Sequence, residues 1–318
     1  MGSGKGPTAK IWRDGTFVDW ADATLHVMSH VVHYGSGVFE GIRCYETPAG
    51  GAVFRLRDHM RRLHDSAKIY RLPVRWSVDE LVEATVDTVA ANGLRHCYIR
   101  PLVARTGEQM GIWAKDAPVE TFIICWEWGT YLGHAAVEHG ADVRISSWRR
   151  AAPNTFPTLA KASGNYLNSQ LTKAEARQDD YLEGIMLDSA GFVAEGSGEN
   201  LFVVRDGTLF TSPLSSGILN GITRDSVISI AADLGLPVKE MVMPREFLYL
   251  VDEAFFCGTA AELTPIKSID RIPVGEGEPG PIFGQIRDRF MGIAKGRLPD
   301  VHEWLTPVPV TEPAESSR

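Results

Sequence analysis

Residues 181–213 read YLEGIMLDSAGFVAEGSGENLFVVRDGTLFTSP and alternate short apolar runs with turn residues. The tripeptides SAG at 189–191 and RDG at 205–207 separate runs that are rich in β-forming side chains. Glycine and aspartate favour turns there, so the pattern predicts four short strands in a β-meander. Such a set of strands is a suitable scaffold for a functional site.

Upstream of these strands, residues 157–167 (PTLAKASGNYL) contain a single lysine, Lys161, with no other charged residue beside it. On composition alone, a lysine is most often found on a solvated face. The alternative is an amine in a partly apolar site, where desolvation lowers its pKa and allows it to form a Schiff base. The neighbouring segments have to distinguish the two.

Downstream, residues 221–235 (GITRDSVISIAADLG) predict a helix with one apolar face that stops at Gly235. The exposed amides at its start, with the hydroxyl of Thr223 beside them, form a site for a phosphate group. The alternative is that Asn220 or Thr223 merely caps the helix.

Glu195 stands at the end of a predicted strand, before a run of small residues that lets a ligand approach the backbone. Its carboxylate could hold a protonated ring nitrogen, although a solvated turn glutamate is the simpler interpretation of this residue alone. Pyridoxal phosphate requires a Schiff-base amine, an anion site and a partner for its pyridine nitrogen. Lys161, the helix start at Thr223 and Glu195 together supply all three, so the sequence predicts this cofactor.

The first part of the chain predicts a separate α/β unit. The Asp14-Gly15 dipeptide between two short β-rich runs is a strong hairpin signal. Helical periodicity and β-rich composition predict further elements. The predicted helices cover residues 56–72 and 78–93, and the predicted strands cover 96–104 and 121–128.

Five segments follow from these patterns. Residues 11–130 are predicted to form a small α/β domain, 131–140 a linker, and 141–305 a larger cofactor-binding domain. Residues 1–10 and 306–318 are expected to be flexible, because glycine, proline, glutamate and serine bury too little apolar surface.

The composition is typical of an ordinary globular protein that folds without disulfide bonds. The 318 residues are 44% hydrophobic and 23% charged, with a net charge of -8 and a pI near 5.6. The acidic balance argues against a nucleic-acid partner, and no apolar run is long enough to cross a membrane. The four scattered cysteines predict buried free thiols, and the N-terminus lacks the apolar core of a signal peptide, so we expect a cytoplasmic protein.

Three other signals favour ordinary structure over chemistry. Gly275, Gly277 and Gly280 have dinucleotide-binding spacing, but the glutamates between them would repel a pyrophosphate, so a turn is expected. The histidines at 26, 30 and 33 lack an accompanying metal motif, so no metal site is predicted. No G-x-S-x-G elbow of a serine hydrolase occurs.

Eight segments, in order and with family-like spacing from Ile11 to about Gly292, resemble the bacterial branched-chain amino acid aminotransferases. They are HYGSGVFEGIRCY, HMRRLHDSAKIY, YIRPL, SSWRRAAPNT, KASGNYLNSQL, LDSAGFVAEGSGENLF, GITRDSV and GTAAELTP. The resemblance implies an α/β (α+β) protein of the fold-type IV pyridoxal phosphate enzymes, with the cofactor site at the interface of two domains. It also implies at least a homodimer.

Position by position, the resemblance implies a role for individual residues. Lys161 would be the Schiff-base lysine and catalytic base, Glu195 the partner of the pyridine nitrogen, and Tyr166 the partner of the ring hydroxyl. The phosphate would be held by Arg62, Ile222, Thr223 and Thr259. The substrate pocket would contain Tyr34, Phe39, Gly41, Tyr98, Arg100, Met110, Ile112, Trp128, Tyr131, Thr259 and Ala260.

The implied activity is a ping-pong transfer of the amino group of L-leucine, L-isoleucine or L-valine to 2-oxoglutarate. Rivals with the same fold are a D-amino acid aminotransferase and an aminodeoxychorismate lyase, but Arg100 is followed by Pro101 and Leu102 rather than by the Arg-x-His expected of D-specific enzymes. A non-enzymatic binding protein would have no reason to keep the Schiff-base lysine. The unusual loop at 105–119 leaves aromatic amino acids and primary amines open as additional donors.

Overall fold

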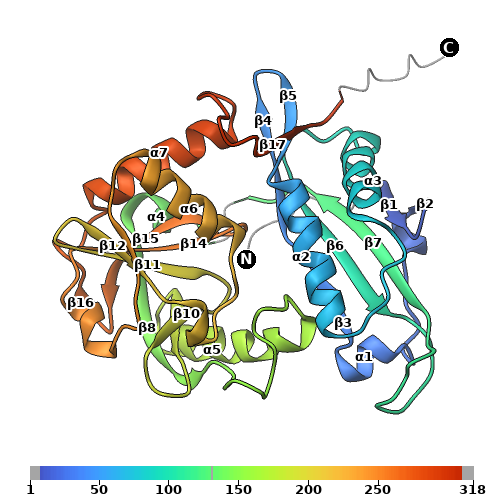
Figure 1. Cartoon of the computed structure of the whole chain (residues 1–318), viewed down its shortest axis with the longest axis horizontal. Helices are drawn as coiled ribbons and strands as arrows, with labels where there is room; N and C mark the ends of the chain where they lie inside the picture. The colour runs from blue at the N-terminus through green and yellow to red at the C-terminus, as the bar shows by residue number, and fades with distance from the viewer. Residues whose placement is uncertain (1–7, 130–131, 310–318) are drawn as a thin grey trace. The chain divides into compact units, whose positions relative to one another are not determined.

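The computed structural model describes residues 8–129 and 132–309, and the chain divides into two compact units (Figure 1). Of these residues, 8–128 and 292–309 form the first unit, and 129 and 132–291 form the second. Most of the two predicted flexible tails lies outside the described residues.

This division differs from the predicted boundaries at two places. Residues after Gly292 group with the first unit, because β17 (Leu305–Pro307) pairs with β5 (Gly50–Phe54). The predicted linker contains a helix, α4 (His134–His139), which packs on a strand of the second unit, β15 (Glu262–Ile269). Its Ala136 lies in that unit's apolar core.

The first unit is built on an eight-stranded sheet in the order β17-β5-β4-β6-β7-β1-β2, with β3 paired to β6. Its remaining strands are β1 (Lys10–Arg13), β2 (Thr16–Asp19), β3 (Gly37–Phe39), β4 (Ile42–Thr47), β6 (Cys97–Arg105) and β7 (Val119–Trp126). Its helices are η1 (Trp20–Asp22), α1 (His30–Tyr34), α2 (Leu56–Ile69) and α3 (Val78–Ala91). Strands β1 and β2 form the predicted hairpin, because Asp14 and Gly15 both adopt positive φ between the paired residues Arg13 and Thr16.

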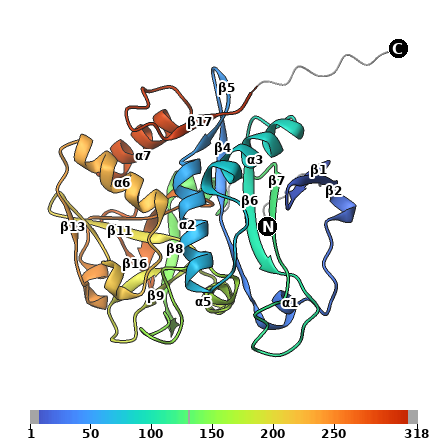
Figure 2. The ribbon, with the colours of Figure 1, turned by 45° about the vertical axis from the view of Figure 1, so that its right-hand side comes forward.

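Helices α2 and α3 pack together against this sheet (Figure 2). The predicted helices at 56–72 and 78–93 are α2 and α3, and the apolar residues Leu56, Met60, Leu63 and Ala67 of α2 are buried. Ser77 and Glu80 fix the start of α3 as a capping box, in which each side chain bonds the other residue's backbone amide. Packing against α3 and the sheet positions α2, which carries His59 and Arg62.

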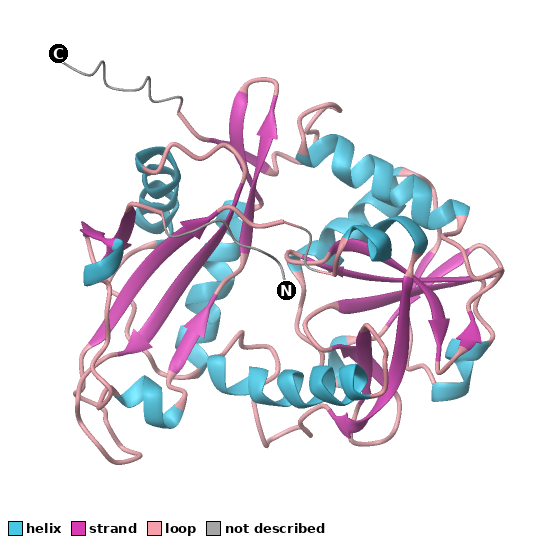
Figure 3. Ribbon diagram, turned by 180° about the vertical axis from the view of Figure 1, so that it is seen from behind, coloured by secondary structure: helices cyan, strands magenta, loops and turns pink. Residues whose placement is uncertain are grey.

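The second unit is built on a nine-stranded sheet in the order β10-β9-β8-β15-β14-β11-β12-β13, with β16 paired to β15 (Figure 3). Its remaining strands are β8 (Ala141–Arg149), β9 (Glu183–Leu187), β10 (Val193–Gly196), β11 (Asn200–Arg205), β12 (Thr208–Thr211), β13 (Val238–Glu240), β14 (Glu253–Gly258) and β16 (Ile272–Pro273). Its remaining helices are η2 (Ser163–Asn165), α5 (Tyr166–Gln178), η3 (Leu214–Ser216), α6 (Ile222–Asp233), η4 (Arg245–Tyr249) and most of α7 (Pro281–Ala294).

The predicted four strands at 181–213 are present, but the predicted meander is wrong. Strands β9 and β10 form one hairpin and β11 and β12 another, while β11 pairs on its other side with β14. Between the hairpins the chain makes a tight turn, in which the Gly196 amide donates to the Glu199 carbonyl at 2.8 Å. The turn ends the ladder and places Glu195 and Asn200 on either side of it.

The glycine-rich segment at 275–280 is a turn, as predicted. The Glu253 carboxylate accepts hydrogen bonds from the amides of Ile282 and Phe283 at 3.0 and 2.7 Å, at the start of α7. A carboxylate of the protein therefore occupies the helix start that a pyrophosphate would need. The four cysteines are buried and free, as predicted. Within the described residues, no helix is both long and apolar enough to cross a bilayer.

Candidate active site

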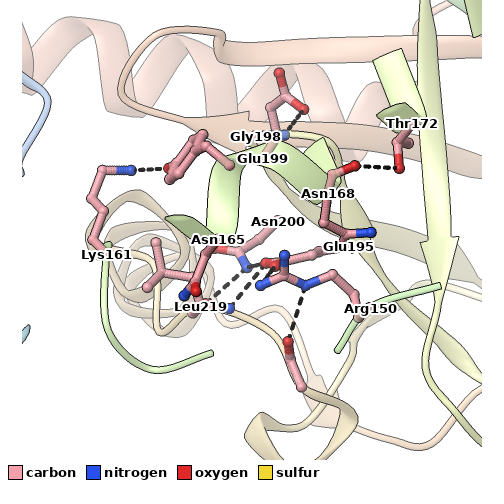
Figure 4. Close-up of polar contacts among 12 residues, drawn as sticks. Arg150, Lys161, Asn165, Asn168, Thr172, Glu195, Gly198, Glu199, Asn200 and Leu219 are labelled. Atoms are coloured by element: carbon pink, nitrogen blue, oxygen red, sulfur yellow. Dashed lines mark hydrogen bonds and ion pairs between the residues drawn. The ribbon is translucent and has the colours of Figure 1, made fainter. Parts of the chain in front are cut away.

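Glu195, on β10, is the centre of a buried polar set in the second unit (Figure 4). Its Oε1 lies 2.9 Å from Nη2 of Arg150, and both side chains are buried. Its Oε2 accepts from the side-chain amide of Asn200 at 3.0 Å and from the backbone amide of Leu219 at 3.1 Å. The carboxylate is thereby fixed from both of its oxygens.

Burial raises the pKa of Glu195 above its ordinary value, and the charge of Arg150 and the Leu219 amide oppose this rise. Arg150 is itself held in place, since its Nε donates to the Gly217 carbonyl at 3.2 Å. The carboxylate therefore combines a cationic partner with a strong desolvation penalty. A second cation, such as a protonated ring nitrogen, would be electrostatically favourable beside it.

Lys161 lies between β8 and α5 and is half-buried. Its Nζ donates a hydrogen bond to the hydroxyl of Tyr166, the first residue of α5. The side-chain amide of Asn165 donates to the carbonyls of Pro157 and Ala160 at 3.1 and 3.0 Å, which fixes the backbone before the lysine. Lys161 is thus held in a defined orientation, and its electrostatic effect extends to Glu195.

The predicted helix after residue 221 is α6, and Ile222 and Thr223 form its first turn. Its N-cap is Gly221, which has no side chain, so neither Asn220 nor Thr223 is the N-cap residue. A Cβ at Gly221 would lie 1.9 Å from Oδ1 of Asn200, so only glycine fits there. Asn200 thus joins the start of α6 to Glu195.

The other two predicted residues of this unit, Thr259 and Ala260, lie in the turn between β14 and β15 and are half-buried. The second unit therefore contributes a lysine, a buried carboxylate, a helix start and this turn.

In the first unit, Arg62 projects from α2 onto the fully buried carboxylate of Glu40. Arg62 donates from Nε and from Nη2, each at 2.7 Å, and Nδ1 of His59 lies 2.6 Å from the same carboxylate. Burial alone would raise the pKa of Glu40, but Arg62 and His59 outweigh it and hold the pKa well below the ordinary value.

Five predicted pocket residues lie together on the sheet of the first unit. The Arg100 guanidinium stands over the ring of Phe39 at 4.6 Å and donates to the Tyr98 hydroxyl at 3.1 Å. Trp128 meets Tyr98 edge to face at 4.4 Å between ring centroids. A Cβ at Gly41 would lie 2.0 Å from the Tyr98 hydroxyl, which explains the glycine. The result is an arginine among aromatic rings, a surface that suits both apolar and anionic groups.

The remaining predicted pocket residues of this unit lie on or beside the loop between β6 and β7. Met110 and Ile112 are exposed, Ile112 to 91%, and the Tyr34 hydroxyl accepts from the Gly111 amide at 3.2 Å. The loop has a defined form, because Nη1 of the buried Arg105 donates to the carbonyls of residues 114, 115 and 117 at 2.5, 3.2 and 3.2 Å. Tyr131 lies outside the described residues.

Sequence reasoning missed Arg150, Asn200 and Glu40. Arg150 and Asn200 fall inside the quoted segments SSWRRAAPNT and LDSAGFVAEGSGENLF, but nothing there separates Arg150 from its exposed neighbour Arg149. For Glu40, the available signal was an acidic residue within an apolar run, VFEGI at 38–42. A charge in such a run indicates a buried ion pair, without giving its partner.

The residues of the second unit fit pyridoxal phosphate. Lys161 supplies an amine, Glu195 a buried carboxylate for a ring nitrogen, and the first turn of α6 supplies amides for a phosphate. The donor set is uncommon outside a cofactor site, because a buried carboxylate with a raised pKa is costly unless a further partner binds it. Among the described residues, no group of three or more histidines, cysteines and acidic residues could hold a metal ion.

Residues 37–269 match the family described as amino-transferase class IV. The branched-chain-amino-acid aminotransferase of Escherichia coli (strain K12) is 53% identical over 299 residues, covering 94% of this chain and 97% of that protein. A crystal structure of the Escherichia coli branched-chain amino acid aminotransferase superposes with a TM-score of 0.91 at 52% identity, covering 95% and 100% of the two chains. The T.th. branched-chain amino acid aminotransferase, complexed with N-(5'-phosphopyridoxyl)-L-glutamate, gives a TM-score of 0.90 at 44% identity and covers 96% and 100%. The chain belongs to the class IV aminotransferases, the fold-type IV family of pyridoxal phosphate enzymes.

Proposed function

We propose that this protein transfers the amino group of L-leucine, L-isoleucine or L-valine to 2-oxoglutarate, with pyridoxal 5'-phosphate as its cofactor. The observation that carries the proposal is the second unit's pairing of a tyrosine-bonded lysine, Lys161, with the buried carboxylate of Glu195. The activity printed for the similar proteins supports the choice of branched-chain substrates. Such an enzyme would serve the synthesis and breakdown of branched-chain amino acids in the cytoplasm.

Seven residues would hold the cofactor. Lys161 would bind its carbonyl carbon, Tyr166 its ring hydroxyl and Glu195 its pyridine nitrogen. When bound, the cofactor supplies an electron sink for the bond that breaks at the substrate α-carbon. The residues proposed to hold its phosphate are Arg62, Ile222, Thr223 and Thr259.

Lys161 would act as the general base when its amine is free. Its Nζ would take the proton from the α-carbon of the amino donor and, in the second half of the reaction, would return a proton to the α-carbon of the acceptor. The Tyr166 hydroxyl, already hydrogen-bonded to Nζ, keeps the amine directed while it exchanges protons. Glu195 holds the ring-nitrogen proton in place, which requires that the carboxylate remain ionised in the loaded enzyme.

The first unit would supply most of the residues that distinguish substrates. The rings of Phe39, Tyr98 and Trp128 would contact an aliphatic side chain, and Arg100 would pair the second carboxylate of 2-oxoglutarate or glutamate. Both substrates use one site in turn, so ping-pong kinetics follow. The remaining proposed pocket residues are Tyr34, Gly41, Met110, Ile112, Tyr131, Thr259 and Ala260.

We also propose that the enzyme is at least a homodimer. Apolar side chains are exposed side by side in sequence on the loop of the first unit, with Ile112 exposed to 91% and Trp113 to 76%. Isolated exposed apolar residues are common, but a bulky adjacent pair on a fixed loop is typical of an interface. Sedimentation at micromolar concentration should give a dimer or larger species, and a monomer would contradict this part of the proposal.

The visible spectrum of the holoenzyme tests the activity. The absorption band of the bound cofactor should bleach on addition of L-leucine and return on addition of 2-oxoglutarate. Lys161→Ala should lose both responses, whereas Lys267→Ala, which removes a partly exposed lysine paired with Asp142, should keep them. A band that resists L-leucine and responds to D-alanine would favour a D-amino acid aminotransferase. Bleaching with an aromatic amino acid or a primary amine would extend the range of donors.

A further inference from the structure

Glu40 is a fully buried carboxylate in the short connection between β3 and β4. Its backbone amide donates to the Pro101 carbonyl at 2.9 Å, so the residue is fixed to strand β6. Its side chain faces α2, where His59 and Arg62 are three residues apart and therefore share a face of the helix. The carboxylate thus links the sheet to one face of α2.

The contact with Arg62 has a specific geometry. Nε and Nη2 each lie 2.7 Å from a different carboxylate oxygen, the fork-to-fork arrangement that fixes both the position and the plane of a guanidinium. His59 Nδ1 lies 2.6 Å from Oε2, so the carboxylate itself is held from a second direction. An arginine side chain loses rotamer entropy when it is fixed, and here the protein has already fixed it.

We propose that Glu40 is a positioning residue that orients Arg62 for the phosphate of the cofactor, with His59 holding Glu40 in turn. The inference rests on the proposed function, in which Arg62 contacts that phosphate. A guanidinium has five N–H donors, and Glu40 engages Nε and Nη2, so its plane is set while donors on Nη1 are directed away from Glu40. The phosphate then meets an arginine that needs no reorganisation.

A competing electrostatic effect has the opposite sign. A carboxylate beside Arg62 lowers the positive potential available to a phosphate, so removing the charge of Glu40 would by itself tighten phosphate binding. Orientation should dominate, because an unpaired buried arginine would seek other acceptors and lose its fixed plane. The direction of the change in affinity therefore distinguishes the two effects.

The test measures dissociation constants of the full-length apoenzyme for pyridoxamine 5'-phosphate and for pyridoxamine, which lacks the phosphate. Neither ligand forms a covalent bond with Lys161, so the comparison isolates the phosphate contact. Glu40→Gln should weaken binding of pyridoxamine 5'-phosphate about tenfold and leave pyridoxamine unchanged. Arg62→Leu should weaken the same ligand at least as much, and the double variant should be no weaker than Arg62→Leu alone, because the two residues act as a unit.

Glu120→Gln is the matched control. Glu120 receives the same fork from Arg13, with Nε at 2.9 Å and Nη2 at 3.1 Å, on strands β1 and β7 of the same unit. It should leave both dissociation constants unchanged.

Four results would overturn the inference. If Arg62→Leu loses phosphate affinity and Glu40→Gln does not, or if Glu40→Gln binds more tightly, orientation by Glu40 is wrong while the proposed role of Arg62 stands. If Glu40→Gln weakens both ligands equally, its role is only structural. If Arg62→Leu itself does not change the affinity for pyridoxamine 5'-phosphate, the proposed phosphate role of Arg62 fails as well.

A second pair of variants keeps the test open if Glu40→Gln does not fold. His59→Gln removes the donor at the Nδ1 position and should weaken pyridoxamine 5'-phosphate selectively, by about threefold. His59→Asn restores an N–H donor near that position and should recover the affinity. Equal behaviour of the two variants would contradict the chain of contacts from His59 through Glu40 to Arg62.

Discussion

Glu40 in the first unit and Glu195 in the second are both buried carboxylates paired with an arginine, and their pKa values move in opposite directions. The pKa of Glu40 lies well below the ordinary value, whereas burial raises that of Glu195 above it. Both carry a desolvation penalty, so burial alone cannot explain the difference. The partners do.

Glu40 receives both nitrogens of the Arg62 fork and the His59 ring. Glu195 receives one guanidinium nitrogen, from Arg150, and two neutral amides. A bidentate guanidinium plus a ring nitrogen stabilises the charged form more than one guanidinium contact does. The first carboxylate is therefore fixed in its ionised state, while the second keeps capacity for a further cation. This difference matches the proposed roles, one residue holding an arginine and the other holding a protonated ring nitrogen.

The largest effect on stability should come from removing Arg150. Arg150→Leu leaves Glu195 buried without this cation and should lower the free energy of unfolding by about 3–5 kcal/mol near pH 8, measured by urea denaturation of the apoenzyme. The loss should be smaller near pH 5, because protonation of Glu195 removes the uncompensated charge. Arg149→Leu removes an exposed neighbour that donates to the Ser189 carbonyl and should cost less than about 0.5 kcal/mol. Equal losses in the two variants would contradict a special contribution of the buried Arg150–Glu195 pair to stability.

Glu195→Gln should affect catalysis more than folding. The amide keeps an acceptor for Arg150 but cannot stabilise a protonated ring nitrogen, so kcat with saturating cofactor should fall about 10²–10³-fold. Glu175→Gln is a suitable control, because that carboxylate bonds Ser147 and Ser146 in the same unit and has no proposed role in the site. An unchanged kcat in Glu195→Gln would mean that the ring nitrogen has another partner.

A third carboxylate sharpens the comparison, because no cation among the described residues hydrogen-bonds to it. Glu199 is buried, with only 4% of its surface exposed. Its Oε2 accepts a hydrogen bond from the Gly198 amide at 3.0 Å, and its Oε1 has no hydrogen-bond partner within the described part of the chain. Burial and the charge of Glu183 raise its pKa to about 8. Glu40 is therefore held ionised, whereas Glu199 keeps its proton at neutral pH.

Glu199→Gln should therefore change how stability depends on pH. The folded state of the natural protein keeps this proton up to about pH 8, whereas the unfolded state releases it near pH 4.3. This contribution is present below the unfolded pKa and is lost as pH rises through the folded pKa. The stability of the variant relative to that of the natural protein should rise by on the order of 4 kcal/mol between pH 5 and pH 8 in urea denaturation. Glu276→Gln, in the exposed turn before α7, should leave the pH profile unchanged, and a Glu199→Gln profile parallel to it would show that Glu199 is ionised.

Local signals predicted the parts of the fold that depend on short-range chemistry. The Asp14-Gly15 hairpin, helices α2, α3 and α6, and the two hairpins of residues 181–213 all follow from turn residues and periodicity. The predicted meander is wrong because β11 pairs with β14, whose residues lie 49 to 57 positions further along the chain, and not with β10. No pattern in the local sequence indicates that strand pairing.

The candidate site shows the same limit. Lys161 and Glu195 stood out because each is a charge among small or apolar residues. Arg150 did not, because Arg149 and Arg150 are alike in sequence. In the structure Arg149 is the exposed last residue of β8, and Arg150, just after the strand, is buried. Glu40 was visible as a charge in an apolar run, but its partners lie 19 and 22 residues away on a helix whose orientation only the fold determines.

The smallest effect should come from the pair that has the geometry of Glu40 without its burial. Arg13 and Glu120 form the same fork, but their side chains keep 29% and 22% exposure, and the pKa of Glu120 is lowered by Arg13 against the desolvation that would raise it. Water can solvate the Arg13 guanidinium when its carboxylate partner is removed. Glu120→Gln should therefore cost about 0–1 kcal/mol of unfolding free energy at neutral pH. The cost should vanish as pH falls through the lowered pKa of Glu120, because that pKa contributes stability only while the carboxylate is ionised. Urea denaturation of Glu120→Gln and Glu40→Gln in parallel measures this directly. If Glu120→Gln proves as costly as Glu40→Gln, the fork itself would decide the energetics, and the burial of Glu40 would not be what makes its arginine rigid.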